Sequence, residues 1–280
     1  MAFKLLLTEA QSALGKAVYH GLEEQSFTVV CPPADNFDWH NAPALSHYLD
    51  EHHPGLLINT LAYNDADAAR SLALAEACRE RQILCLHISS YRVFGTAGCE
   101  DHGVDETVQP EPDDDVGLGL LAAEEAFRNL DSSLVLRLPW IMDPAGDNIF
   151  TRVVSHLLSG DLLEVSDVCR GCPTTLDDVQ RVITAIVLQL FCGAKNWGVF
   201  HLHTSDSCSE AEFADSLARL LEKEGQAVSD IDVRRNRECR LIQGCGLLKG
   251  ARCMNNFGIQ MRSWRQDLKP LVREWLGKKL

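Results

Sequence analysis

In the first half of the chain, apolar residues form short unbroken runs, and between these runs they recur every three or four positions. The unbroken runs predict strands at residues 3–8, 27–31, 55–59, 83–89 and 133–141. The stretches with helical spacing predict helices at residues 13–24, 42–52, 65–82 and 116–130. Apolar strands separated by helices of about ten or more residues indicate a parallel sheet that is covered on both faces.

After residue 141 this regular alternation ends. Helices are predicted at residues 147–159, 176–192 and 263–279, and strands at residues 162–166 and 198–204. No linker or low-complexity stretch divides the chain. We therefore expect an α/β fold in two parts. Residues 1–141 form a Rossmann-type, doubly wound parallel sheet of the dinucleotide-binding kind, and residues 142–280 form a smaller, interleaved substrate-type lobe with segments that return to the first domain.

Composition narrows the choice of partners. The 280 residues carry a formal net charge of −14, which argues against nucleic acid or an anionic membrane as the main partner. No apolar run approaches the roughly 20 residues that a membrane-spanning helix needs. The first ten residues turn polar too early for a secretory signal. We expect a cytoplasmic protein.

The eleven cysteines are scattered, and several lie inside apolar segments. This distribution is typical of reduced, buried thiols in a cytosolic protein. Cys169 and Cys172 have the spacing of a ligand pair, but no second pair or nearby histidine accompanies them. A lone pair of this kind is weak evidence for zinc, so we predict no metal site.

Residues 5–18, LLLTEAQSALGKAV, have the strand–turn–helix pattern of a dinucleotide-binding turn, yet two of its usual glycines are missing. Glu9 and Ser12 take their places, and only Gly15 remains. A carboxylate about 4 Å from a phosphate is repelled by on the order of 4 kcal/mol. The helix N-terminus contributes only about 0.3–1 kcal/mol of attraction. We expect impaired dinucleotide binding.

Seven segments in the right order resemble one protein family. Besides residues 5–18, they read LLINTLAYND, HISSYRVFG, VDETVQPEP, LVLRLPWIMDPAGDNI, GCPTTLDDV and NNFGIQMRSW. Together they resemble the extended short-chain dehydrogenase/reductases of the dTDP-4-dehydrorhamnose reductase type, to which the regulatory beta subunit of methionine adenosyltransferase is related. The resemblance covers nearly the whole chain.

The resemblance implies a catalytic site that has lost most of its chemistry. Ser90 matches the family's substrate-binding serine or threonine, so here it is interpreted as vestigial. Val116 and Leu120 stand at the positions of the catalytic tyrosine and lysine, and neither side chain can carry a proton or a charge. Tyr91, directly after Ser90, is a substitute acid to be weighed, as is Tyr63 after the third strand.

The resemblance also implies which residues would border a dinucleotide. These are Glu9, Ser12, Ala13, Leu14, Gly15, Asp38, Trp39, Leu61, Ala62 and Tyr63. Because of the substitutions in the first turn, we expect NAD or NADP to bind weakly or not at all.

The main interpretation is a reductase-fold pseudoenzyme. The glycines, the tyrosine and the lysine are lost while the core strands are intact, which favours a regulatory or scaffold protein with a protein partner and weak nucleotide or sugar-nucleotide binding. The alternative is an active NADPH-dependent reductase of a nucleotide-linked 4-keto sugar with an unrecognised acid. A sensor that binds a sugar nucleotide without turnover is a third interpretation. The sequence leaves a homodimer open.

Overall fold

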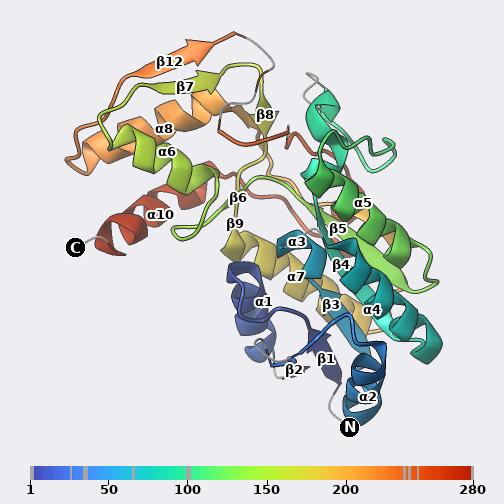
Figure 1. Ribbon diagram of the computed structural model, residues 1–280. Coiled ribbons are helices and arrows are strands. Elements are labelled where there is room, and N and C mark those ends of the chain that lie inside the picture. The colour runs from blue at the N-terminus through green and yellow to red at the C-terminus, as the bar shows by residue number, and fades with distance from the viewer. Residues whose placement is uncertain are drawn as a thin grey trace.

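A parallel sheet of six strands forms the centre of the computed structural model (Figure 1). The structure describes residues 3–25, 27–33, 37–64, 67–98, 102–235, 238, 241–244 and 246–278. The strands of the sheet are β1 (Lys4–Leu7), β2 (Thr28–Val30), β3 (Leu56–Asn59), β4 (Leu84–Ser90), β5 (Ser133–Leu138) and β10 (Gly198–His201). They lie in the order β10–β5–β4–β3–β1–β2, and every neighbouring pair is parallel.

The chain winds outward from the middle of this sheet in both directions. It passes from β1 to β2 on one side, whereas β3, β4, β5 and β10 follow one another on the other side. The carboxyl ends of β1 and β3 therefore border the crevice in which sheets of this kind bind ligands. This arrangement confirms the doubly wound α/β fold expected from the sequence.

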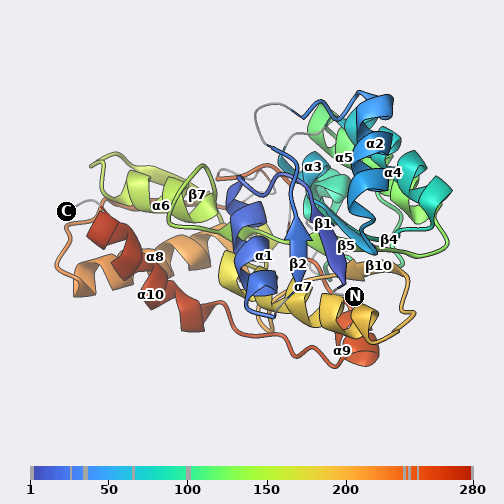
Figure 2. The same ribbon diagram turned by 90° about the horizontal axis from the view of Figure 1, so that it is seen from below.

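Helices cover both faces of the sheet (Figure 2). They are α1 (Ala13–Glu23) and α7 (Leu176–Phe191) on one face, and α2 (Ala42–His52), α4 (Ala68–Arg81) and α5 (Asp115–Arg128) on the other. Side chains alternate along β1, so that Leu5 and Leu7 share a core with α1 and α7, whereas Leu6 shares one with α2 and α4. Within the described ranges, no helix has both the length and the apolar character needed to cross a membrane.

A second lobe lies beside the sheet, at the upper left of Figure 1. Its main elements are α6 (Ile149–Leu157), β7 (Leu163–Ser166), α8 (Glu210–Lys223), β12 (Ile231–Arg234) and α10 (Arg265–Lys278). β7 and β12 pair in parallel. The core of this lobe contains the fully buried rings of Phe150, Phe213 and Trp264. Between β7 and α8 the chain returns to the sheet through α7 and β10. The division at residue 141 stays a prediction.

Short elements connect the two parts of the chain. They are α3 (Leu61–Asn64), the 3₁₀ helix η1 (Tyr91–Gly98), β6 (Ile141–Met142), β8 (Arg170–Gly171), β9 (Thr174–Thr175), β11 (Cys208–Ser209) and α9 (Arg252–Phe257). β8 and β9 lie between the strand predicted at residues 162–166 and the helix predicted at residues 176–192, where the sequence predicted no strand. β8 pairs with β11, and β9 pairs with β6. All four strands have only two residues, and the partners are distant in the sequence, so no local pattern marks them.

Most of the described cysteines are thiols, in keeping with the mostly reduced cysteines that the sequence predicted. Cys169 is disulfide-bonded. Cys172 is not its partner, because the buried Cys172 side chain is not part of a disulfide. Free thiols are found at Cys31, Cys78, Cys85, Cys192, Cys208 and Cys253. With Cys172, five of these seven cysteines are buried, as the sequence predicted for thiols that act as small apolar side chains.

Candidate active site

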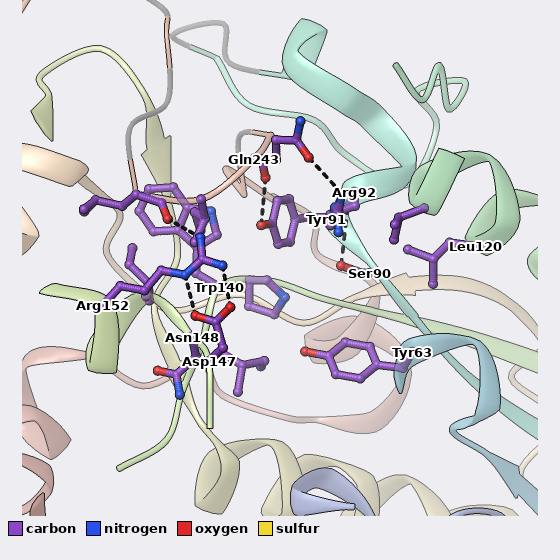
Figure 3. Close-up of a pocket in the computed structure, with 16 residues that line it drawn as sticks. Tyr63, Ser90, Tyr91, Arg92, Leu120, Trp140, Asp147, Asn148, Arg152 and Gln243 are labelled. Carbon is purple, nitrogen blue, oxygen red and sulfur yellow. Dashed lines mark hydrogen bonds and ion pairs between the residues drawn. The ribbon is translucent and has the colours of Figure 1, made fainter. Parts of the chain in front are cut away.

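A cavity of about 590 Å³ lies between the carboxyl end of the sheet and the second lobe (Figure 3). Its wall is built from the ends of β4 and β5, from α3, α5 and α6, and from the segment 241–243. Pockets that bind small molecules generally enclose about 300–1,000 Å³. The cavity is therefore large enough for an organic substrate.

Ser90 contributes a hydroxyl group to this wall. It is the last residue of β4, where a central strand ends at the crevice, and its side chain is almost fully buried. The backbone N–H of Arg92 donates a long hydrogen bond of 3.4 Å to the Ser90 Oγ. The hydroxyl proton of Ser90 stays available for a carbonyl oxygen in the cavity.

Helix α5 contributes apolar side chains to the wall of the cavity. Asp114 caps the helix by accepting a hydrogen bond of 2.6 Å from the backbone N–H of Gly117. Val116 and Leu120 follow on one face, a turn apart, and both line the cavity with Ser90. Val116 is 38% exposed and Leu120 only 2% exposed. The structure thus brings together the three positions to which the resemblance pointed, while their roles stay predictions.

Two phenol groups line the cavity in different ways. Tyr91 belongs to η1, and its hydroxyl donates a hydrogen bond of 3.0 Å to the backbone carbonyl of Gln243. Tyr63 extends from α3, and Figure 3 shows its ring reaching into the cavity from the side opposite Gln243. Burial raises the pKa of Tyr63 above its ordinary value of 10.0. Its phenol therefore keeps its proton at neutral pH.

Charged side chains from α6 and from the loop before it line another side of the cavity. The Arg152 guanidinium donates hydrogen bonds to both Asp147 oxygens, with Nη2 2.6 Å from Oδ2, and a further one of 2.7 Å from Nη1 to the Leu241 carbonyl. The hydrogen bond from Arg152 holds the pKa of Asp147 below its usual value. Arg92 reaches the same segment by a hydrogen bond of 3.2 Å to Gln243 Oε1.

Sequence reasoning missed these charged side chains. Asp147 and Arg152 belong to a loop and a helix of the second lobe, and Leu241 and Gln243 lie almost a hundred residues further along the chain. The only signal was a pair of opposite charges five residues apart at the start of a predicted helix, which is common on solvated helices.

Trp140 forms the back of the cavity. Two glycines lie against its ring: a side chain at Gly171 would come within 2.3 Å of the ring, and one at Gly246 within 2.4 Å. Trp140 is therefore fixed by close backbone packing.

The turn after β1 has an unusual backbone. Glu9 adopts a φ of 46°, in the left-handed region that favours glycine. Ser12 caps α1, accepting a hydrogen bond of 2.9 Å from the backbone N–H of Gly15. A side chain at Gly15 would approach the Glu9 carbonyl to 2.1 Å, so this close contact requires glycine. The Glu9 carboxylate is paired with Arg70, whose Nη1 lies 3.4 Å from Glu9 Oε1.

A smaller cavity of about 260 Å³ lies over this turn. Among its lining residues are Glu9, Ser12, Trp39 and Arg70. The other residues predicted to border a dinucleotide differ in position. Tyr63 lines the larger cavity, whereas neither of the two cavities is lined by Ala13, Leu14, Gly15, Asp38, Leu61 or Ala62. The side chains of Leu14, Leu61 and Ala62 are buried in the core, so only their backbone could meet a ligand.

Comparison with known proteins matches nearly the whole chain to one family. Residues 3–276 match the family described as RmlD substrate binding domain. A dTDP-4-keto-6-deoxy-D-glucose reductase from Streptomyces niveus is 29% identical over 238 residues, which cover 79% of this chain and 78% of the relative. A dTDP-4-dehydrorhamnose reductase from Streptomyces griseus is 24% identical over 231 residues, covering 77% of this chain and 75% of the relative.

Solved structures share the fold along the full length. The dTDP-4-dehydrorhamnose reductase from Bacillus anthracis, crystallised with NADP, has a TM-score of 0.76 at 19% identity and covers 98% of this chain and 99% of its own. An orthologous structure from Clostridium acetobutylicum has a TM-score of 0.79 at 20% identity, covering 98% of this chain and 100% of its own. These similarities confirm the fold and the family resemblance stated from sequence.

The comparisons contradict the main functional interpretation drawn from sequence. That interpretation was a pseudoenzyme with a regulatory or scaffold role, whereas the relatives named above are reductases. They favour the alternative interpretation. The error came from giving the missing phenol at Val116 and the missing ammonium group at Leu120 more weight than the phenols of Tyr63 and Tyr91, which line the same cavity.

Proposed function

Because this chain belongs to the RmlD substrate binding domain family, we propose that it is an NADPH-dependent reductase of a nucleotide-linked 4-keto sugar. One observation carries the proposal. The cavity at the carboxyl end of the sheet places the Ser90 hydroxyl and phenol groups around one space of substrate size. The names of the relatives supply the substrate class: a sugar with a keto group, linked to a nucleoside diphosphate.

The turn after β1 fits the diphosphate of a dinucleotide. A lone carboxylate at Glu9 would repel it, but the Arg70 guanidinium 3.4 Å away offsets that charge. The N-terminus of α1 adds its attraction for anions. Arg70, Ser12 and the first amides of α1 would hold the diphosphate. The aromatic side chain of Trp39, which packs edge-on against Phe37, would contact the base.

When bound, NADPH supplies a hydride to the keto carbon. The chain's own residues position the carbonyl and exclude water from it. Ser90 donates a hydrogen bond to the keto oxygen and so fixes its direction. Leu120 and Trp140 provide the apolar wall against which the sugar ring lies. The guanidinium groups of Arg92 and Arg152 line the cavity in ion pairs with Asp114 and Asp147, and they would meet the substrate's phosphates by exchanging these partners.

The test is a turnover assay with the purified protein. NADPH is mixed with dTDP-4-keto-6-deoxy-D-glucose or with dTDP-4-dehydrorhamnose, and the loss of NADPH absorbance is followed. We expect enzyme-dependent oxidation that saturates with the keto sugar. The non-keto dTDP-glucose serves as the matched control and should give none. If NADPH binds and no keto sugar is reduced, the proposed activity is refuted.

A further inference from the structure

The reduction of a ketone needs a proton as well as a hydride, and few groups in the large cavity can supply it. Among the described residues that line it, the side chains with an O–H group are Tyr63, Ser90 and Tyr91. The charged side chains are Arg92, Asp147 and Arg152, and this lining holds no histidine, lysine, cysteine or glutamate. The source of the proton must be sought in this small set.

Most of these groups are unsuited to the task. Asp147 is a carboxylate at neutral pH, because the hydrogen bond from Arg152 lowers its pKa. Arginine does not release its proton in proteins. A serine hydroxyl is a far weaker acid than a phenol, so Ser90 can orient the carbonyl but not protonate it. Tyr91 already directs its proton to the Gln243 carbonyl, 3.0 Å away.

We propose that Tyr63 is the proton donor of the reduction, an inference that rests on the function proposed above. Tyr63 lies in α3, which follows the carboxyl end of β3, and β3 is the strand next to the one that ends in Ser90. Figure 3 shows the Tyr63 ring extending into the cavity below Ser90 with its hydroxyl directed toward the interior. The Tyr91 hydroxyl, in contrast, points toward Gln243.

The reaction then balances in one step. A C–H bond forms at the keto carbon as the C–H bond at carbon 4 of the dihydronicotinamide ring breaks. The ketone is reduced to an alcohol and the cofactor is oxidised. The keto oxygen, held by Ser90, takes the phenol proton of Tyr63 as negative charge develops on it. After the product has left, water enters the cavity and returns a proton to the Tyr63 phenolate.

Tyr63 acts without a lysine beside it. Leu120 lies at the lysine position and is buried, so no ammonium group lowers the pKa of a nearby phenol. Burial instead raises the pKa of Tyr63. The phenol is consequently protonated at physiological pH. The same raised pKa makes it a weaker acid, so the driving force for proton transfer is smaller.

The substitution Tyr63→Phe tests this role, because it removes one oxygen and retains the ring. We expect kcat to fall about 100-fold or more, in line with the loss of a general acid, while the Kd for NADPH and the melting temperature stay within error. Tyr19→Phe is the matched control. Tyr19 lies in α1 and packs against the core of the sheet, away from the cavity, and its variant should keep wild-type kcat.

The outcomes separate the two proposals. If Tyr63→Phe retains wild-type kcat, Tyr63 is not the donor, although the reductase function stands. If its main effect is on KM with kcat unchanged, Tyr63 binds substrate without donating a proton, and the inference is also wrong. If the wild-type protein binds NADPH but reduces no keto sugar, both proposals fall. A folded Tyr63→Phe variant with intact NADPH binding and lost kcat supports the inference.

Discussion

For Glu9, the sequence identified the position in the turn correctly but did not show which side chain pairs with its carboxylate. The sequence identified a carboxylate where the first glycine belongs, and the φ of 46° shows that the backbone still adopts a glycine-like conformation. The sequence could not reveal the counterion, because Arg70 is 61 residues away and reaches Glu9 only through the fold. The Arg70 guanidinium offsets part of the charge on which the predicted repulsion of a phosphate rests, while the predicted weak binding of the cofactor stays a prediction.

The variant Glu9→Gly should bind NADPH more tightly. Glycine removes the carboxylate that repels the diphosphate and frees Arg70 to bind it, a gain in binding free energy on the order of 1 kcal/mol. We expect the Kd from a fluorescence titration to fall about fivefold. Glu9→Gln, which removes the charge and keeps a side chain of the same length, should lower the Kd similarly. An unchanged or higher Kd for Glu9→Gly would show that Glu9 is no obstacle to the cofactor.

The pH dependence of turnover is a second prediction at this scale. A phenol donates only while it is protonated, so activity is present below its pKa and is lost as pH rises through it. Because burial raises the pKa of Tyr63 above 10.0, kcat should show no alkaline fall between pH 7 and about 10. A stopped-flow pH profile checks this. A decline centred near pH 8 would point to a different acid.

Single positions were predictable where the chain resembles the family. Ser90, Val116 and Leu120 were identified through the family resemblance, and all three line the cavity. Arg152 and Gln243 were not predictable, because their meeting depends on how a helix and a distant segment of the second lobe pack together.

At the scale of elements, a buried ion pair joins α5 to the sheet. Glu124 lies one turn beyond Leu120, and its carboxylate binds Arg137 of β5 through Nε at 2.9 Å and Nη2 at 2.7 Å. Ser89 of β4 donates a further hydrogen bond of 2.5 Å to Glu124. His201 stays neutral beside Arg137, because burial and then the Arg137 charge lower its pKa to about 3. This network fixes the helix that carries the cavity wall.

Glu124→Gln should destabilise the protein strongly. It leaves the Arg137 charge buried without a countercharge, and loss of one partner of a buried pair costs about 3–5 kcal/mol. Urea unfolding measures this change. The exposed pair of Glu76 and Arg79 on α4 provides the control, and Glu76→Gln should cost less than about 1 kcal/mol. Equal losses for both variants would mean that the buried pair does not stabilise the fold.

The elements themselves were predictable to different extents. The six sheet strands and their covering helices follow from apolar runs and helical spacing, which are local signals. β12 was missed because its sequence, IDVR, is half polar and the strand with which it pairs, β7, lies almost seventy residues earlier. Such a strand is defined by its pairing and not by its own residues.

For the whole molecule, the fold was easier to predict than the function. Core packing needs only apolar side chains at regular positions, and these are intact throughout the chain. Activity depends on a few groups, and their replacement at Val116 and Leu120 led to the wrong prediction of a pseudoenzyme. The expected protein partner and homodimer stay predictions, because the structure describes one chain.

The most direct test of the central claim, that the protein reduces a sugar ketone in the large cavity, is to follow the transferred hydride. The wild-type protein is incubated with dTDP-4-dehydrorhamnose and NADPH carrying deuterium at carbon 4 of the nicotinamide ring, one diastereomer at a time, and the product is analysed by mass spectrometry and NMR. The account predicts that one diastereomer delivers its deuterium to the former keto carbon. An unlabelled sugar recovered with its ketone intact after both incubations would contradict it.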